Sequence, residues 1–153
     1  MGPGNNPTEQ DLHAAFELGK RIAKEGWVLL TGGRNIGVMD AATRGAAEEG
    51  GLSVGVLPDV DTKHMSNFVD IPIVTGVGSA RNNINVLSSD FVIACGTGIG
   101  TTSEIMLAVK AGKNVIVLNQ SEEALSFYRS LAEDRLQEVS SPAEAIQTIK
   151  DMI

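Results

Sequence analysis

The sequence has a single cysteine, few aromatic residues and no long hydrophobic run. One cysteine, Cys95, excludes an internal disulfide and a zinc site built from several cysteines. The longest apolar runs, 27–30 and 91–95, have the length of a strand, far short of the roughly 18 residues that cross a bilayer, so a membrane protein is excluded. The first residues lack a basic patch followed by an apolar stretch, so no signal peptide is recognised. These absences predict a cytoplasmic protein.

Positive charge is also scarce, with 12 Lys and Arg against 19 Asp and Glu and a formal net charge of −7. Because surfaces that follow nucleic-acid phosphates are basic, the composition argues against a nucleic-acid partner. An anionic small molecule would need local backbone N–H groups and one or two placed cations, since the chain as a whole repels it. Binding an anion therefore requires a built pocket.

Helical and strand-like patterns alternate along the whole chain, without a linker, repeat or low-complexity segment. The prediction is a single Rossmann-like ligand-binding domain, 1–153, long enough to form a core without disulfides. Strands that are apolar throughout are typical of a parallel sheet buried on both faces. Their alternation with helices predicts a doubly wound open parallel α/β sheet with helices on both faces. The predicted strands are 27–30, 53–57, 71–74, 91–95, 114–118 and 136–139, and the predicted helices are 7–25, 38–49, 80–87, 102–111, 122–132 and one that follows Ser141.

Two helix starts carry capping signals. Asn6 is expected to be the N-cap of the first helix, with Pro7 at the first helical position and Glu9 completing a capping box. The run Ser141-Pro142-Ala143-Glu144 predicts the same arrangement for the last helix.

The start of the sequence does not match the usual order of elements in a doubly wound fold. Gly2-Pro3-Gly4 has the composition of a phosphate-facing loop, but no strand precedes it, and the strand before such a loop is usually central. Either an upstream segment is absent or the sheet closes around a gap. We expect a missing first strand upstream of Gly2, in a segment of about eight to ten residues.

The strongest local signal is the glycine-rich run Gly96–Gly100, which follows a predicted strand, where open α/β sheets bind their ligands. Glycines let backbone approach a ligand closely, and the helix that follows offers unpaired N–H groups to an anion. The absence of a Gly-Lys-Ser/Thr ending excludes a Walker-type site. The alternative is a tight turn without function. Glu104 also has two interpretations. It completes a capping box with Thr101, or it binds a hydroxyl or amine of a ribose or pterin at the mouth of the pocket.

Two other loops each contain an arginine. In Thr31–Gly37, Arg34 is either a ligand-binding cation or an ordinary surface residue. In Thr75–Asn83, Arg81 stands at a helix start, where a structural arginine gains nothing from the helix dipole. A guanidinium there can fork onto a phosphate, so Arg81 is the predicted functional cation.

The remaining candidates carry less chemistry. His13 is expected on the surface of the first helix, and His64 lies in the polar loop 59–70 without a second His or Cys to complete a metal site. We therefore expect no metal ligands from protein side chains. Cys95 is expected to pack as a small hydrophobe. A Ser-His-Asp hydrolase is excluded because its Gly-x-Ser-x-Gly elbow is missing.

The stretch Gly98–Glu104 is similar to the Pro-Gly-Gly-x-Gly-Thr-x-x-Glu signature of the lysine decarboxylase-like Rossmann proteins. These proteins include the cytokinin-activating nucleotide phosphoribohydrolases. The resemblance implies that Arg81 and Glu104 would be catalytic in a hydrolase that cleaves the N-glycosidic bond of nucleoside 5′-monophosphates. The chain departs from that pattern at Gly96 and Thr97, which replace Pro-Gly, and at Asn82, which replaces a lysine.

A fuller pattern resembles the molybdenum cofactor carrier proteins of algae and cyanobacteria. The resemblance rests on Gly2–Gly4, Gly26–Arg34, Gly37–Met39, Gly55–Pro58, Asp70–Gly76 and Ser79–Asn85. It implies a homotetramer that binds molybdenum cofactor as cargo, protects it and delivers it to apo-molybdoenzymes without catalysing a reaction. The phosphoribohydrolase remains the alternative. The residues expected to bind the cofactor are Gly2, Pro3, Gly4, Gly32, Gly33, Arg34, Gly37, Ser79, Arg81, Asn82, Gly96, Thr97, Gly98, Ile99, Gly100, Thr101, Thr102 and Glu104.

Overall fold

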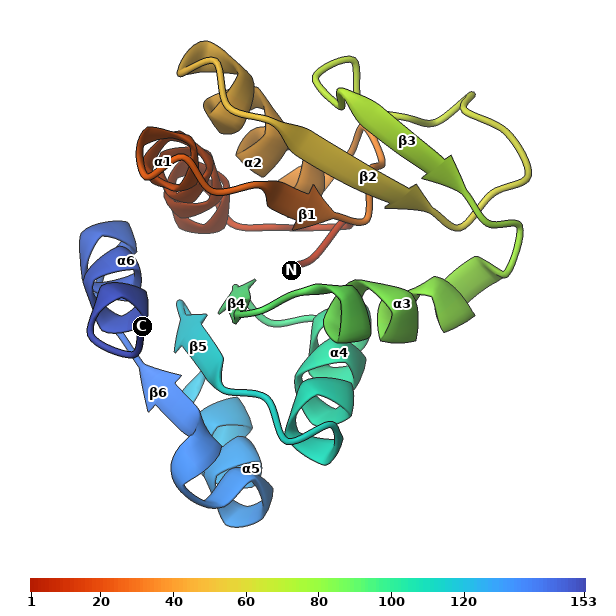
Figure 1. Ribbon diagram of the computed structural model, residues 1–153. Helices are drawn as coiled ribbons and strands as arrows, with labels where there is room; N and C mark the ends of the chain where they lie inside the picture. Colours follow the sequence, from red (N-terminus) through yellow and green to blue (C-terminus); the bar gives the residue numbers. More distant parts are fainter.

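The computed structural model describes residues 1–153 and alternates six strands with six α-helices (Figure 1). The strands are β1 (Leu29–Thr31), β2 (Ser53–Leu57), β3 (Ile71–Val74), β4 (Val92–Cys95), β5 (Val115–Leu118) and β6 (Leu136–Glu138). The helices are α1 (Glu9–Lys24), α2 (Gly37–Glu48), α3 (Arg81–Ser88), α4 (Ile99–Lys110), α5 (Glu122–Ala132) and α6 (Pro142–Lys150). A short 3-10 turn, Gly78–Ala80, leads into α3, and a second, Glu133–Arg135, follows α5.

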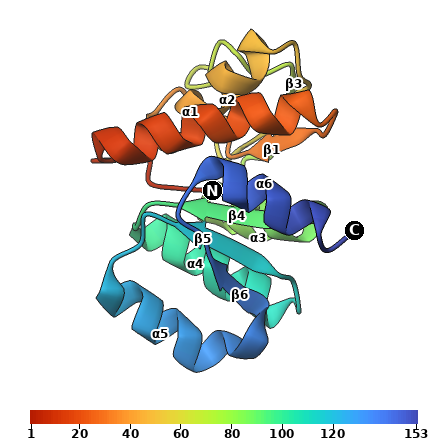
Figure 2. The same cartoon turned by 90° about the vertical axis from the view of Figure 1, so that its left-hand side faces the viewer.

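The strands form two parallel three-stranded sheets, in the orders β1-β2-β3 and β4-β5-β6. The N-terminal segment runs between them, as both views show (Figures 1 and 2). There Met1 donates from its amino group to the carbonyl oxygen of Ile93 at 2.6 Å, and Cys95 N–H donates to the carbonyl oxygen of Met1 at 2.9 Å. The predicted parallel α/β fold with helices on both faces is confirmed, with its six strands divided between two sheets.

Two apolar clusters hold the helices against the sheets. The first joins α1, α2 and α6 to residues such as Leu29 and Ile116, and the second joins α3, α4 and α5 to residues such as Val92 and Val117. Small residues let α1 and α2 approach closely: a Cβ on Gly19 would lie 2.0 Å from the carbonyl oxygen of Ala42. The tight packing of α1 on α2 fixes the loop that joins β1 to α2, which is part of the site described below.

Two predicted helix starts are wrong. The N-cap of α1 is Thr8, whose hydroxyl accepts from the N–H of Asp11 while the Asp11 carboxylate accepts from the N–H of Thr8. Asn6 instead adopts a left-handed conformation with φ of 51°. Helix α4 begins at Ile99 rather than 102, so Thr101 lies inside its first turn and makes no capping hydrogen bond. By contrast, Ser141 caps α6 as expected.

The strands and the remaining helices match their predicted ranges closely. Strands β2 and β3 and helix α5 have the predicted bounds, and the others shift by one or two residues at one or both ends. None of the helices has the length and apolar character needed to span a membrane.

Candidate functional site

Three of the predicted loops meet at one rim of the molecule. Gly37 has a φ of +57°, and a Cβ there would lie 2.4 Å from the carbonyl oxygen of Pro3. The N–H of Val38 donates to that same oxygen at 3.1 Å. A Cβ on Gly98 would lie 3.3 Å from Pro3 Cβ. The loop Gly2–Gly4 therefore packs against both the loop Gly32–Gly37 and the loop Gly96–Gly100.

Arg81, the first residue of α3, brings the fourth loop to this rim. Its guanidinium lies against Gly32, where an added Cβ would be 2.4 Å from Nη1 and 2.6 Å from Cζ. Only glycine leaves room at position 32 for the guanidinium in this place. Burial lowers the pKa of Arg81 from its ordinary value, and the negative charge of Glu104 partly opposes that change. Arginine stays charged under both influences, so Arg81 is a nearly buried cation at the rim.

Glu104 and Asn85 hold Arg81 from the other side. Glu104 is buried in α4, and its Oε1 accepts from Asn85 Nδ2 at 3.2 Å and lies 3.7 Å from Arg81 Nη1. Arg81 Nε and Asn85 Oδ1 are buried without a hydrogen-bond partner. Because buried polar groups are nearly always paired, these atoms mark a place where a ligand or water would complete the hydrogen bonds. Of the two interpretations of Glu104, the capping box with Thr101 is not formed, and the carboxylate lines the cavity.

The start of α4 supplies backbone donors. Its N-cap is Gly98, and no side chain satisfies the first N–H groups of the helix. Unpaired N–H groups and the positive end of the helix dipole favour an anion at such a terminus. Gly100 lines the cavity, and Ile99 is 93% exposed and points to solvent. An anion that reaches this helix start also lies beside the loop that contains Pro3.

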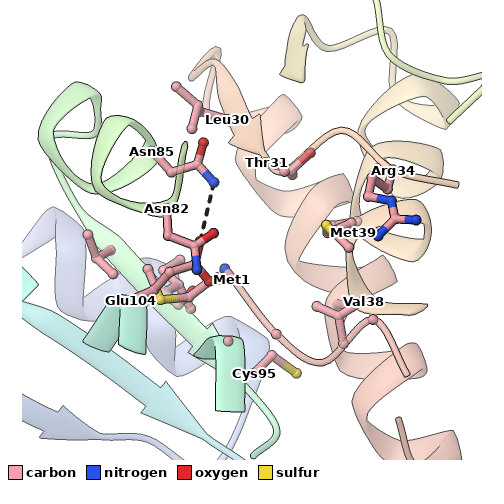
Figure 3. Close-up of a pocket in the computed structure, with 18 of the residues that line it drawn as sticks. Met1, Leu30, Thr31, Arg34, Val38, Met39, Asn82, Asn85, Cys95 and Glu104 are labelled. Carbon is pink, nitrogen blue, oxygen red and sulfur yellow. Dashed lines mark hydrogen bonds between the residues drawn. The ribbon is translucent and has the colours of Figure 1, made fainter. Parts of the chain in front are cut away.

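A cavity of about 370 Å³ joins these parts. Figure 3 places Asn82, Asn85 and Glu104 on one side of it, Arg34 and Met39 on the other, and the chain at Met1 between them. Its inner part runs between β1 and β4 and is lined by apolar residues of α1 such as Leu18 and Ile22. Of the predicted binding residues, those that line the cavity are Gly2, Gly4, Gly32, Arg34, Ser79, Arg81, Asn82, Gly100 and Glu104.

The other predicted residues lie behind or beside the cavity. Gly33, Gly37 and Gly96 shape the loops: a Cβ on Gly33 would lie 2.8 Å from Gly55 Cα, and one on Gly96 would lie 2.7 Å from the Asp11 carboxyl carbon. Thr102 and Thr97 point toward α5 and the end of β5, respectively. Thr102 Oγ1 hydrogen-bonds to the Tyr128 hydroxyl at 2.7 Å, and Thr97 donates to Gln120 at 3.1 Å. Pro3, Gly98 and Thr101 complete this group of residues outside the cavity lining, together with Ile99.

Hydrogen bonds hold the loop 59–70 against the loop that joins β1 to α2 and against the start of α2. The N–H of Asn35 donates to the carbonyl oxygen of His64, and Ser66 donates to Asp40 at 2.7 Å. Arg34, which is partly exposed, faces Asp59 at 4.0 Å. Arg34 therefore borders the cavity with a carboxylate beside it, whereas Arg81 has Glu104 as its acidic neighbour.

Cys95 ends β4 beside the cavity as a buried thiol. Burial raises its pKa to about 12, and the nearby Asp11 adds to this effect. The group is a protonated thiol at neutral pH, not a nucleophile. No three or more His, Cys, Asp or Glu side chains are grouped to hold a metal ion.

Sequence reasoning missed Asn85 and Met39 as functional candidates. Asn85 stands four residues after Arg81, so both fall on one side of a helix, and this spacing was the available signal. Met39 Sδ lies 3.9 Å from Arg81 Nη2, a contact between distant segments that no local pattern contains.

Comparisons with known proteins show which family the chain belongs to. A sequence model of the SLOG cluster4 family matches residues 1–146. The chain belongs to this family. It is similar to the molybdenum cofactor binding protein from the phototrophic bacterium Rippkaea orientalis, at 53% identity and a TM-score of 0.98, over 99% of this chain and 93% of that one. It is also similar to the Moco carrier protein from Chlamydomonas reinhardtii, at 50% identity and a TM-score of 0.93, with the same coverage.

The expected resemblance to molybdenum cofactor carrier proteins is thus confirmed. A more distant similarity links this SLOG cluster4 protein to the cytokinin riboside 5′-monophosphate phosphoribohydrolase of Mycobacterium tuberculosis. The two are 35% identical over 103 residues, which are 65% of this chain and 55% of the relative. Both expected groups of relatives are therefore found, and the carriers have the higher identity over a larger share of this chain.

Proposed function

We propose that this protein binds molybdenum cofactor, protects it and delivers it to apo-molybdoenzymes without catalysing a reaction. The observation that carries the proposal is the meeting of Arg81, the start of α4 and the glycine loops at one cavity. The likeness to a cofactor binding protein at a TM-score of 0.98 supports the choice of ligand. The cytoplasmic location that the composition suggested and the homo-oligomer that the resemblance implied are part of this proposal.

The residues at the rim fit the chemistry of this cargo. The cofactor is a pterin with a phosphate and a dithiolene, and the dithiolene supplies the sulfur ligands of its molybdenum. A protein without a cluster of metal-ligating side chains can therefore hold it. The N–H groups at the start of α4 suit the phosphate, and Arg81 suits a second negative group.

The test is retention of the cofactor. The protein is incubated with molybdenum cofactor and passed through a desalting column, and the pterin that remains bound is oxidised to its fluorescent form and measured. We expect retention by the unaltered chain and at least a ten-fold loss in Arg81→Ala. The matched control is Arg135→Ala, which removes a partly exposed arginine outside the cavity. Absence of retention by the unaltered chain, or equal losses in both variants, would refute the proposal.

The alternative function is the hydrolysis of nucleoside 5′-monophosphates. It is favoured by one observation: Arg81 and Glu104, which match the catalytic pair of that family, lie 3.7 Å apart in the cavity. In that reading the phosphate occupies the same glycine loops, while Glu104 acts on the ribose or as acid–base. Incubation with adenosine monophosphate distinguishes the two functions. Release of free adenine that Glu104→Ala abolishes would establish the hydrolase and overturn the carrier.

A further inference from the structure

A buried carboxylate lies in the same cavity as the groups that suit an anion. Glu104 is 6% exposed and lines the cavity from α4, and its negative charge would repel a phosphate placed against it. Burial of a charged side chain is costly unless partners compensate for it. The phosphate of the cargo therefore belongs elsewhere in the cavity, and Glu104 suits a neutral group that donates hydrogen bonds.

The two oxygens of this carboxylate differ in their contacts. Oε1 accepts a hydrogen bond from Asn85 Nδ2 at 3.2 Å, which fixes the orientation of the carboxylate (Figure 3). Oε2 has no hydrogen-bond partner within the protein and is not enclosed by it. Because a carboxylate has about four acceptor sites, Glu104 keeps free acceptor sites that face the cavity.

Arg81 adds a donor beside these acceptors. Its Nη1 lies 3.7 Å from Glu104 Oε1, which is too far for a hydrogen bond, so the two groups lie side by side without closing the pair. Nη2 contacts Met39 Sδ at 3.9 Å, whereas Nη1 has no hydrogen-bond partner. The wall of the cavity therefore presents one donor, Arg81 Nη1, followed by two acceptors, Oε1 and Oε2 of Glu104.

The order of one donor and two acceptors complements one edge of a 2-amino-4-oxopyrimidine ring. That edge presents the oxygen at position 4 as an acceptor, followed by N3–H and the 2-amino group as adjacent donors. A carboxylate can accept from two adjacent N–H donors, as it does in its bidentate pairing with arginine. Pterins contain this ring, and molybdenum cofactor is a pterin.

We propose that Arg81 and Glu104 bind the 2-amino-4-oxopyrimidine edge of a pterin, and that Asn85 is the positioning residue that holds Glu104 for this contact. The inference rests on the proposed function and adds the orientation of the cargo. The ring lies between α3 and α4, while the phosphate lies toward the glycine loops and away from Glu104. The other N–H groups of Arg81 stay available to an anionic group. The site thus selects its cargo by the ring as well as by the charge.

Two fluorescent compounds, pterin-6-carboxylate and lumazine-6-carboxylate, test this edge. They carry the same carboxylate and differ at position 2 of the ring, where lumazine has an oxygen in place of the amino group. The unaltered chain is expected to bind pterin-6-carboxylate at least ten-fold more tightly, because in lumazine an oxygen would face the oxygens of Glu104. Equal affinities overturn the proposal, as does binding of neither compound.

Variants separate recognition of the ring from recognition of an anion. Glu104→Gln and Asn85→Leu nearly conserve side-chain volume, and each should reduce the preference for pterin over lumazine to less than about three-fold. The matched control is Glu122→Gln, which removes an exposed carboxylate on α5 and should keep the full preference. A preference that persists in Glu104→Gln overturns the role of Glu104, and one that persists in Asn85→Leu overturns the positioning role of Asn85.

Inorganic phosphate, titrated by calorimetry, tests the orientation of the cargo. Glu104→Gln should bind phosphate at least as tightly as the unaltered chain, because the variant loses a negative charge from the cavity. A folded Glu104→Gln that binds phosphate less tightly overturns the placement of the phosphate away from Glu104.

Guanine presents the same edge as a pterin, so guanosine 5′-monophosphate is titrated as a second source of this chemistry. Binding tighter than that of pterin-6-carboxylate assigns the edge to a guanine nucleotide and overturns the pterin. Retention of molybdenum cofactor tests the proposed function separately. Retention with equal affinities for the two rings overturns only this inference, whereas a preference for pterin without retention of the cofactor overturns only the carrier function.

Discussion

Replacing Gly32 by alanine should displace the Arg81 guanidinium, which we propose binds the ligand, without altering Arg81 itself. The added Cβ would lie 2.4 to 2.6 Å from Nη1, Nη2 and Cζ of Arg81, far inside van der Waals contact. Gly32 does not adopt a positive φ, so alanine fits its backbone, and the atoms in conflict belong to the end of a flexible side chain. The chain should therefore fold while the guanidinium moves away from the rim.

The expected loss follows from the hydrogen bond that the guanidinium gives an anion. A charge-assisted hydrogen bond contributes about 1.5–3 kcal/mol, which corresponds to about 10- to 150-fold in affinity. Gly32→Ala should weaken cofactor retention within that range, close to the effect of Arg81→Ala. Circular dichroism melting would establish that the variant is folded.

A double-mutant cycle decides whether Gly32 acts through Arg81. If it does, Gly32→Ala combined with Arg81→Ala loses no more affinity than Arg81→Ala alone, because the displaced group is already gone. Losses that multiply in the double variant would refute the reasoning, since Gly32 would then contribute a contact of its own.

Three other predictions concern stability. Gly33→Ala should cost about 2–4 kcal/mol, because it places alanine in a left-handed conformation and against Gly55. Gly112 has nearly the same φ and open space around it, so Gly112→Ala should cost about 1–2 kcal/mol. Equal urea midpoints for the two variants would refute the clash. Burial raises the pKa of Cys95 from 9.0 to about 12, so the unfolded chain loses this proton first and stability should fall as pH rises from about 9 toward about 12. Cys95→Ala should lack that component, and identical pH profiles would contradict the assignment. We also propose that the edges of β1 and β4 accept a parallel strand between them. An apolar β-forming segment of about eight residues fused ahead of Met1 should then raise the melting temperature, whereas a proline-containing segment of the same length should not. Equal melting temperatures of the two fusions would contradict the proposal.

The fold was largely predictable because its signals are local. Strand β2 is apolar and bounded by glycine and proline, and α5 is amphipathic between clear ends, so both have the predicted bounds. The start of α1 was not predictable from its cap residues, because Asn6, Thr8 and their neighbours all suit an N-cap and the Asp11 carboxylate decides between them. The expected strand upstream of Gly2 stays a prediction.

The sequence predicted the loops of the candidate site but not the contacts between helices behind them. Glycines at strand ends identified the rim, and the position of Arg81 at a helix start identified the cation. The partnership of Glu104 with Asn85 joins α4 to α3, which no spacing within either helix reveals. The start of α4 was placed too late because Gly98 and Gly100 have low helix propensity, which the packing of Ile105 and Ala108 in the core overrides.

The most direct test of the central claim is an amide NMR titration of the protein with molybdenum cofactor. If the loops form one cradle, the N–H signals of Gly2, Gly4, Gly32–Gly37 and Gly98–Thr101 should shift together with one affinity. The signals of the distant turn at Gly112 should stay in place. Shifts confined to one loop, or spread over the surface without these residues, would contradict the account.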